Sequence, residues 1–444
     1  MMHYHMIGIG GIGMSGLALL ALSKGYTVSG SDVTASSITR DLQNKGATIF
    51  IGHKAEQVPS HATVVFTSGI TLDNPEFLQA HSQGCRIRHR SEALCDLMKG
   101  QKPLCVAGTH GKTTTTSLLT HVLTHAGLDP SYAIGGILKS VGAQAGYGTG
   151  QWFVLEADES DGSFLSYHPE GAILTNINLD HMSYWKTEQA LMKGFCAFSE
   201  SIKDARLRIF CIDDPRIASL SLQGVSYGFS EQAMMRILHI NSDGWHTDCL
   251  MLYREKEFSL RLPLIGRHNC LNAAGVCALG IQLGLDVKTL QEAFCSFQGA
   301  KRRAEKKGEA CGVLFYDDYA HHPVEIATTL QGFRDAAMRR LVVVFQPHRY
   351  TRVRDCFHDF AKALSLADLL VMTDIYSAGE SLLPDISTEA LHREIQKTKA
   401  CHLVSRSKLV EEILSIIKEG DLVVTLGAGD VTRVGDECLR RFLP

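Results

Sequence analysis

Short apolar runs alternate with amphipathic stretches along the first hundred residues of the chain. A helix is expected to begin near Gly13, directly after a glycine-rich turn. The apolar runs predict strands at residues 3–9, 27–31, 47–50 and 63–67. Strands that alternate with helices form a parallel sheet, because parallel neighbours need a crossover connection.

The same alternation begins again twice further along the chain. After Gln101-Lys102-Pro103, an apolar strand at residues 104–107 leads into a second glycine turn and a long threonine-rich helix. Further strands of this second unit are expected at residues 152–156, 172–175 and 208–212. A basic stretch at residues 299–307 opens a third unit. Its expected strands lie at residues 313–316, 341–345, 369–373 and 422–426.

Length and composition indicate a folded protein of several domains. The chain has 444 residues, and roughly 100–200 residues per domain suggests about three domains. Hydrophobic residues make up 45%, charged residues 20%, and there are only 11 prolines, as in globular rather than disordered chains. We therefore expect an α/β protein with domains at residues 1–100, 101–298 and 299–444.

Charge and terminal sequence argue against several classes of protein. A net charge of -3 and a pI near 6.7 do not suit a chain that coats nucleic acid or an anionic membrane. The opening Met1-Met2-His3-Tyr4-His5 is no secretory leader, and no apolar run approaches the roughly 20 residues that span a bilayer. The 13 cysteines include no C-x-x-C pair, which favours reduced thiols. We expect a cytoplasmic protein without membrane insertion or a nucleic-acid partner.

The first glycine-rich loop, Gly8-Ile9-Gly10-Gly11-Ile12-Gly13, follows a predicted strand and opens a predicted helix. Asp32 lies about 20 residues further on, at the end of the next strand, as in a dinucleotide site. Glycines let the backbone approach a pyrophosphate at a helix N-terminus, and UDP supplies that group as well as NAD does. Ser31 and Asp32 are then placed to contact a base or ribose. A structural tight turn and a strand-end cap are the alternatives.

The second loop, Gly108-Thr109-His110-Gly111-Lys112-Thr113, is a shortened P-loop. The usual motif has four residues between its glycines, whereas Gly108 and Gly111 are separated by two. The chemistry is retained, because backbone N–H groups can cradle phosphates, Lys112 can neutralise their charge, and Thr113 can offer a hydroxyl to magnesium. The alternative is an exposed loop with a solvated lysine.

Acidic residues follow two strands of the second unit. Glu156 ends one strand and is followed by Asp158 and Asp161, and His181 comes soon after another. Hard cations bind carboxylate oxygens, so these positions are candidates for holding the magnesium of a nucleotide. Solvated acids after a strand, and a structural histidine, are the alternatives.

With both glycine loops in this order, the chain resembles the Mur ligases over essentially its whole length. Further segments favour the alanine-adding member of that family over the related ligase that reattaches a recycled tripeptide. These segments are Glu156-Ala157-Asp158-Glu159-Ser160-Asp161, Gly266-Arg267-His268-Asn269, Asp317-Asp318-Tyr319-Ala320-His321-His322-Pro323 and Phe345-Gln346-Pro347-His348-Arg349-Tyr350-Thr351-Arg352.

The resemblance implies a Rossmann-like N-terminal domain, a central P-loop ATPase domain with a parallel sheet, and a Rossmann-like C-terminal domain. It implies UDP-N-acetylmuramate, L-alanine and ATP as substrates, Mg²⁺ or Mn²⁺ as cofactor, and a possible monomer–dimer equilibrium. The implied chemistry is phosphorylation of a carboxylate by ATP, attack of the alanine amine on the acyl phosphate, and loss of phosphate.

The resemblance also implies roles for individual residues. UDP-substrate contacts fall on Gly10, Gly11, Ile12, Gly13, Ser31, Asp32, Thr67 and Ser68. ATP contacts fall on Gly108, Thr109, His110, Gly111, Lys112, Thr113, Thr114, Asn269, Asn272, Arg303 and Asp317. Metal ligands are Thr113, Glu156 and His181, and the amino acid meets Tyr319, His321, His348, Arg349 and Arg352. Lys112, His181, Arg349 and Arg352 are the expected catalytic residues.

Some positions depart from the family pattern. Asn178 and Ser183 stand where a glutamate and an aspartate are usual around His181, which puts support of the second metal in question. Ala320 replaces a common glycine and Ala304 a common aromatic residue. Arg302 and Arg303 are either solvated or join the site on domain closure.

Two other functions compete with ligation. An oxidoreductase would use only the first glycine loop and would leave Lys112, Glu156 and the arginines of the third unit without a role. A nucleotide-regulated binding module would use both loops without forming a bond. Release of phosphate that requires both a UDP-sugar acid and an amino acid separates ligation from both.

Overall fold

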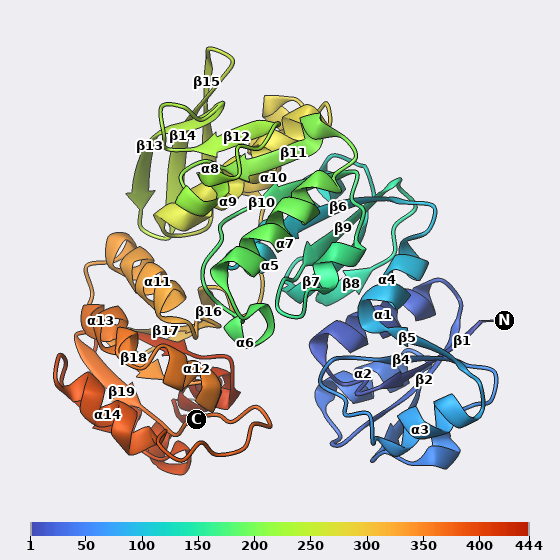
Figure 1. The fold of residues 1–444 in the computed structure, drawn as a ribbon. Coiled ribbons are helices and arrows are strands. Elements are labelled where there is room, and N and C mark those ends of the chain that lie inside the picture. Colours follow the sequence, from blue (N-terminus) through green and yellow to red (C-terminus); the bar gives the residue numbers. More distant parts are fainter. Residues whose placement is uncertain (1, 443–444) are drawn as a thin grey trace. The chain divides into compact units, whose positions relative to one another are not determined.

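The computed structural model describes residues 2–442, which form two compact units. One unit contains the chain up to His239 together with Leu250–Leu260 and Leu271–Gln298. The other contains Ile240–Cys249, Arg261–Cys270 and the chain from Gly299 onward. The described residues form three sheets, and Figure 1 labels many of their strands and helices.

The first sheet has the strand order β3-β2-β1-β4-β5, and all of its strands are parallel. Its strands are β1 (His3–Ile7), β2 (Thr27–Asp32), β3 (Thr48–Ile51), β4 (Thr63–Phe66) and β5 (Arg86–His89). Its helices are α1 (Ile12–Ser23), α2 (Ser37–Asn44), α3 (Pro75–Ser82) and α4 (Arg90–Met98). The strand order reverses beside β1, and ligands of open parallel sheets bind at such a reversal.

The second sheet has ten strands in the order β15-β14-β13-β12-β11-β10-β6-β9-β7-β8. Its strands are β6 (Lys102–Ala107), β7 (Ser131–Leu138), β8 (Ala143–Gly146), β9 (Trp152–Ala157), β10 (Gly171–Leu174), β11 (Arg208–Cys211), β12 (Val225–Gly228), β13 (Met235–Asp243), β14 (His246–Tyr253) and β15 (Lys256–Leu262). The helices are α5 (Lys112–His125), α6 (Met182–Trp185), α7 (Glu188–Glu200), α8 (Pro215–Ser219), α9 (Arg267–Gln282) and α10 (Val287–Cys295). β6 pairs in parallel with β9 and β10, so the loops after these three strands begin at one edge of the sheet.

The third sheet has the order β16-β17-β21-β18-β19-β20, in which β16 alone is antiparallel to its neighbour. Its strands are β16 (Glu305–Ala310), β17 (Val313–Asp318), β18 (Leu341–Phe345), β19 (Leu369–Met372), β20 (Cys401–Leu403) and β21 (Leu422–Leu426). Its helices are α11 (Pro323–Ala336), α12 (Tyr350–Asp355), α13 (Asp359–Ala363), α14 (Thr388–Gln396), α15 (Leu409–Ile416) and α16 (Val434–Arg441).

The central strands are apolar at consecutive positions because both faces of each parallel sheet are covered. β18, with the sequence Leu-Val-Val-Val-Phe, is buried at every position. Each such side chain contributes about 1.5–3 kcal/mol by leaving water. The α/β fold with parallel-containing sheets predicted from the sequence is confirmed. Among residues 2–442, no helix combines the length and the hydropathy that crossing a bilayer requires.

Candidate functional site

The first glycine loop connects β1 to α1. Gly8 has a φ of +78°, which favours glycine, and Gly11 is the N-cap of α1. The Gly10 N–H donates to the Asp32 carboxylate at 2.8 Å, so the acid at the end of β2 fixes the loop. Ile12 is 42% exposed at the start of the helix. The loop therefore presents a helix N-terminus with an apolar residue beside it.

Ser31 points into the protein rather than toward the loop surface. Its side chain is fully buried, and its hydroxyl donates to Glu76 and lies 2.8 Å from Nδ1 of His53. Glu76 is also fully buried and faces His5, 3.6 Å away. Ser31 thus belongs to an internal polar network, while Asp32 is the member of the pair that meets the loop.

Thr67 and Ser68 follow β4, and Ser68 contacts one of the acidic residues of the second unit. The Thr67 hydroxyl accepts from the Gly69 N–H at 3.3 Å, and Ser68 donates to Asp161 at 3.0 Å. Arg90, at the start of α4, lies beside the first loop, since a Cβ added to Gly13 would come within 3.3 Å of its side chain. The sequence analysis did not single out Arg90, which adds a positive charge next to the loop.

The second glycine loop connects β6 to α5 and is closed against the loop after β10. Gly108 has a φ of +135°, and a Cβ there would lie 2.1 Å from the Thr175 hydroxyl. The His110 N–H donates to Asn176 at 2.9 Å, and the Asn176 amide donates back to the His110 carbonyl at 3.0 Å. These contacts hold the loop in one conformation.

Asn272 of α9 closes the other side of this loop. A Cβ added to Gly111, whose φ is +81°, would lie 2.8 Å from the Asn272 side-chain oxygen. Asn269 is one helical turn earlier and is also buried, and its amide donates to the Ile265 carbonyl at 2.8 Å. Asn272 therefore contacts the predicted phosphate loop, whereas the Asn269 amide bonds to the backbone just before its own helix.

Lys112 opens α5 and is surrounded by oxygen atoms. Its ammonium donates to the Gly108 carbonyl at 2.7 Å, the Thr109 carbonyl at 3.3 Å and the Glu159 carboxylate at 2.6 Å. Asp158 is 3.6 Å away. Thr109, Thr113 and Thr114 are buried around this lysine's helix start. The solvated-lysine alternative is excluded, because the Lys112 side chain is only 13% exposed.

The predicted metal ligands lie on neighbouring strand ends. Glu156, at the end of β9, accepts from the Gly135 N–H at 2.7 Å, and its negative charge helps to raise the pKa of Lys112. Burial would raise the pKa of Asp158, but the positive charges of Lys112 and His181 outweigh burial and lower it. His181 has a φ of +56° and lies 3.7 Å from Asp180.

These donors suit a cation that is shared with a ligand. Within residues 2–442, no three His, Cys, Asp or Glu side chains converge as a complete metal cage. Magnesium is commonly held by one or two carboxylates, with phosphates and waters completing its shell. The carboxylate of Glu156 and the hydroxyl of Thr113 therefore fit magnesium that arrives with a nucleotide.

Aromatic and basic side chains gather at the carboxyl ends of β17 and β18. The ring of His321 lies 5.2 Å from that of Tyr319 and 5.7 Å from that of His348. His348 stacks on Tyr376 at 5.6 Å, and Arg352 of α12 lies 3.4 Å from its Nδ1. The structure thus brings together four of the five residues predicted for the amino acid.

Arg349, the fifth, precedes α12 in a strained conformation. Its φ is +68°, which is uncommon for a residue with a Cβ, and its N–H donates to the Tyr376 carbonyl at 2.8 Å. Burial, followed by the charges of His321, Arg352 and Arg349, lowers the pKa of His348 to about 3. His348 is therefore neutral at neutral pH, and the arginines supply the positive charge.

The guanidinium carbons of Arg302 and Arg303 lie 4.7 and 5.1 Å from the centre of the Tyr319 ring. Arg302 donates to the carbonyl groups of Gly427 and Gly429, so it is not a solvated side chain. Asp317 is fully buried and accepts from Thr425 and Thr432, each at 2.6 Å. Burial raises the pKa of the neighbouring Asp318 to about 6.

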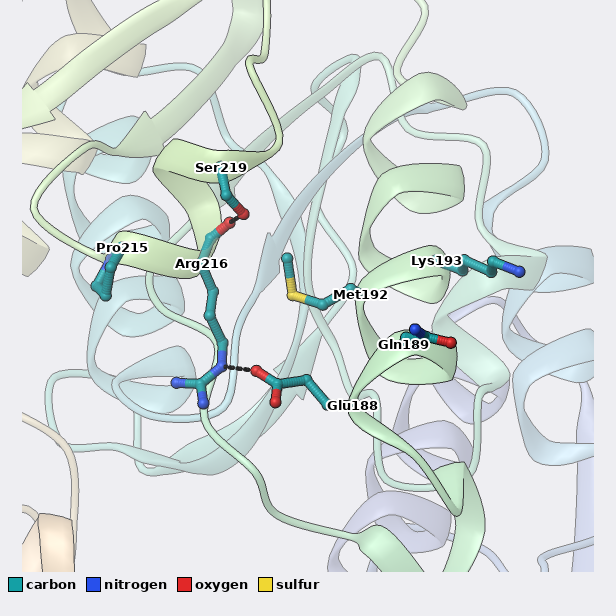
Figure 2. Close-up of a pocket in the computed structure, with 7 residues that line it drawn as sticks. All are labelled: Glu188, Gln189, Met192, Lys193, Pro215, Arg216 and Ser219. Carbon is teal, nitrogen blue, oxygen red and sulfur yellow. Dashed lines mark hydrogen bonds and ion pairs between the residues drawn. The ribbon is translucent and has the colours of Figure 1, made fainter.

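A separate cavity of about 610 Å³ lies between α7 and α8 (Figure 2). Glu188 and Arg216 pair across it at 2.7 Å, with Met192 beside them. Residues predicted for the active site do not line this cavity. The cavity lies next to the loop after β10, because Arg216, which lines it, donates to the Ile177 carbonyl at 3.5 Å.

The fold and the two loops define a nucleotide-binding α/β protein of the P-loop type. Three known domain types match the chain: "Mur ligase family, catalytic domain" at residues 3–102, "Mur ligase middle domain" at 106–280 and "Mur ligase, glutamate ligase domain" at 302–429. The chain belongs to the Mur ligase family.

Individual relatives span the whole chain. A UDP-N-acetylmuramate–L-alanine ligase of Anaeromyxobacter dehalogenans is 45% identical, over 98% of this chain and 96% of its own length. The crystal structure of the UDP-N-acetylmuramate-alanine ligase of Thermotoga maritima is similar with a TM-score of 0.86 and 30% identity, covering 100% and 99% of the two chains. A murein peptide ligase of Psychrobacter arcticus is similar with a TM-score of 0.74 and 25% identity, covering 100% and 99%.

Proposed function

We propose that this protein is an ATP-dependent ligase that joins L-alanine to the lactoyl carboxylate of UDP-N-acetylmuramate, releasing ADP and phosphate, in the synthesis of peptidoglycan precursors. The observation that carries the proposal is the 45% identity over 98% of the chain to a ligase named for these two substrates. The related murein peptide ligase is less similar, at 25% identity, which favours alanine over a peptide as the added group.

The proposed division of labour follows the three parts of the chain. Residues 1–100 bind UDP-N-acetylmuramate, 101–298 bind ATP, and 299–444 bind alanine. The first loop takes the diphosphate, with Arg90 as an additional cation and Asp32 holding the loop in shape. Ser68 lies within hydrogen-bonding distance of His89 and Asp161, and we assign it and the neighbouring Thr67 to this site.

The second loop takes the triphosphate. Backbone N–H groups and Lys112 neutralise the charge that develops on the transferred phosphoryl group, with Asn272 packed against the loop. Magnesium, or manganese in its place, would be held by Thr113, Glu156 and His181 and would supply charge neutralisation on the phosphates. Asn269, Arg303 and Asp317 complete the proposed ATP site.

The cluster of the third sheet takes the amino acid. A free amino acid presents a carboxylate, and a planar guanidinium matches that group in a bidentate geometry. Arg349 and Arg352 lie at the start of one short helix, beside neutral His348, so they are placed to hold one carboxylate. Tyr319 and His321 then bound the space for a small side chain.

The proposed reaction proceeds through an acyl-phosphate intermediate. ATP phosphorylates the lactoyl carboxylate, the alanine amine attacks the acyl phosphate, and phosphate leaves. We place this reaction in the cytoplasm, without membrane insertion or a nucleic-acid partner, and with a monomer–dimer equilibrium as the oligomeric state.

Release of phosphate tests the proposed function. We expect ATP to release phosphate only when UDP-N-acetylmuramate and L-alanine are both present. Mass spectrometry should detect one molecule of amide product for each phosphate. Phosphate release without either substrate, or none with both, would reject ligation.

The same assay measures selectivity for the amino acid. A single small side-chain group is worth about 1–3 kcal/mol in a binding pocket. We therefore expect alanine to be preferred over glycine and serine, and all three over the tripeptide L-alanyl-γ-D-glutamyl-diaminopimelate. A higher kcat/KM for the tripeptide would transfer the proposal to the peptide-adding ligase.

Gly13→Val is expected to weaken UDP-N-acetylmuramate binding about tenfold or more, and ATP binding far less. A side chain at this position meets Arg90 at 3.3 Å, and such overpacking costs about 1–3 kcal/mol. Calorimetric titration of each substrate measures the two affinities. Ser23→Val, at the exposed far end of α1, is the matched control and should change neither. Saturable NADH binding by fluorescence would instead support the oxidoreductase alternative.

A further inference from the structure

The ammonium group of Lys112 has no donor left for a phosphate. A lysine has three N–H donors, and Lys112 uses them on the Gly108 carbonyl, the Thr109 carbonyl and the Glu159 carboxylate. The bond to Glu159 is the shortest, at 2.6 Å, and is the only one of the three to a charged group. A lysine that binds a phosphate oxygen must therefore first give up one of these partners.

Glu159 is held firmly in place by the protein. Its side chain is 1% exposed, and its backbone carbonyl accepts from the indole N–H of Trp185 at 3.0 Å and from the Gly162 N–H at 3.2 Å. Trp185 is itself buried and packs edge-on against Phe164. Because the backbone of Glu159 is fixed from two sides, the exchange of partners falls to the longer and more mobile lysine side chain.

The carboxylate of Glu159 depends on Lys112 for compensation. Its second oxygen, Oε1, is buried and has no hydrogen-bond partner among residues 2–442. Burial alone would lower the pKa of Lys112, but Glu159, Asp158 and Glu156 outweigh burial and raise it. The two groups therefore form an ion pair in a confined site, where separating the charges is costly.

We propose that Glu159 is a positioning residue that holds Lys112 on the protein, and that nucleotide binding transfers the lysine from Glu159 to a phosphate. This inference rests on the proposed function, because it takes Lys112 as the group that meets ATP. The Lys112–Glu159 pair lowers the affinity for nucleotide, because its hydrogen bond must break first, but it keeps the lysine in a fixed position. It also makes ATP without a divalent cation a poor ligand, because the triphosphate would lie beside Glu159, Asp158 and Glu156 with their charge uncompensated.

Glu159→Gln tests the proposal by the sign of its effect on nucleotide binding. Glutamine keeps the shape and one acceptor oxygen but replaces a charged hydrogen bond with a neutral one. We expect the variant to bind ATP about tenfold more tightly, because a hydrogen bond to a charged group is roughly twice as strong as a neutral one. The gain should be larger without magnesium than with it. Calorimetric titration with ATP, with magnesium or with EDTA, measures both values.

A merely structural role for Glu159 predicts the opposite sign. If Glu159 only supports the loop, its replacement loosens the loop and weakens ATP binding. Weaker or unchanged ATP binding by a variant that keeps the circular dichroism and cooperative unfolding of the wild type would overturn the proposal. Glu231→Gln is the matched control, because Glu231 pairs with Arg236 at 3.0 Å, is 85% exposed and lies outside the proposed ATP site. We expect it to change the affinity by less than about twofold, since exposed pairs contribute little.

Two further variants cover the other outcomes. If Glu159→Gln does not fold, Glu159→Asp keeps the charge but withdraws the carboxylate from Lys112, and it should also tighten ATP binding; no gain in that folded variant would overturn the proposal. Lys112→Met separates this inference from the proposed function. If Lys112→Met binds ATP as tightly as the wild type does, the phosphate-loop role of Lys112 itself fails. If binding requires Lys112 but neither Glu159 variant tightens it, only the role of Glu159 fails.

Discussion

Lys112→Ala is expected to lower the rate of ligation by about 10³-fold or more, because preplaced charge at a transferring phosphoryl group is among the largest single contributions to such catalysis. The substitution removes the ammonium group at the start of α5 that donates to Glu159 and to the carbonyls of Gly108 and Thr109. UDP-N-acetylmuramate binding should be nearly unchanged, since the first loop follows a different strand of a different sheet.

Lys112→Ala is also expected to lower the free energy of unfolding, because it breaks the ion pair with Glu159. Removing Lys112 leaves Glu159 buried and uncompensated, and breaking a buried pair typically costs about 3–5 kcal/mol. A lower denaturant midpoint must therefore be separated from loss of catalysis. The double variant Lys112→Met with Glu159→Gln removes both charges and should recover much of the lost stability while remaining inactive.

We would measure the ligation rate and the urea unfolding midpoint for the wild type, Lys112→Ala and the double variant. The phosphate-loop role requires that both variants are inactive at temperatures where both are folded. Near-normal ligation by either folded variant would show that Lys112 does not act on the nucleotide.

Most of the parallel sheets could be predicted from the sequence because their strands are apolar at consecutive positions. The predicted strand at residues 341–345 matches β18, and that at 422–426 matches β21. Two of the strands that were not predicted, β16 and β5, lack this signal. β16 has the sequence Glu-Lys-Lys-Gly-Glu-Ala, and part of it lies in the basic stretch predicted to precede the first strand of the third unit. β5, Arg-Ile-Arg-His, is an edge strand with only one aliphatic residue.

The glycine loops could also be predicted, because their chemistry is written in consecutive residues. The partners of those residues could not, because they come from distant parts of the chain. Glu159 is 47 positions from Lys112, and only the register of β6 on β9 brings them together. In the same way, the sequence placed Ser31 beside a ligand, whereas the structure directs its hydroxyl to Glu76, 45 positions away.

The arginines of the third sheet were predicted as a pair, but their surroundings were not. Tyr376 follows β19 and stacks on His348, and no local motif marks it. The positive φ of Arg349 is likewise invisible in the sequence, since glycine or asparagine would be the usual residue there. A strained residue in a proposed binding site indicates that the backbone conformation matters for placing its side chain.

Arg349→Ala is therefore expected to raise the KM for alanine at least about 30-fold, with much smaller changes for ATP and UDP-N-acetylmuramate. We expect bound alanine to cover the pair between its carboxylate and Arg349. Removing one partner of a covered charge pair costs about 2–5 kcal/mol, and each 1.4 kcal/mol is about tenfold. Arg354→Ala is the matched control, because Arg354 lies on α12, which Arg349 precedes, and its side chain is paired with Asp355 instead of facing the proposed amino-acid site. It should leave all three constants nearly unchanged.

The alternative role for Arg349 is to meet the γ-phosphate of ATP, and the acyl phosphate distinguishes the two. If the arginine holds the alanine carboxylate, Arg349→Ala still phosphorylates UDP-N-acetylmuramate when alanine is absent, because the amino acid enters only in the next step. If it serves the phosphate, the variant loses that first step as well. Borohydride reduction converts the acyl phosphate to a stable alcohol, which mass spectrometry can quantify in wild type and variant without amino acid. We expect equal amounts in both, and loss of the trapped product in a folded variant would move Arg349 from the amino-acid site to the phosphate site.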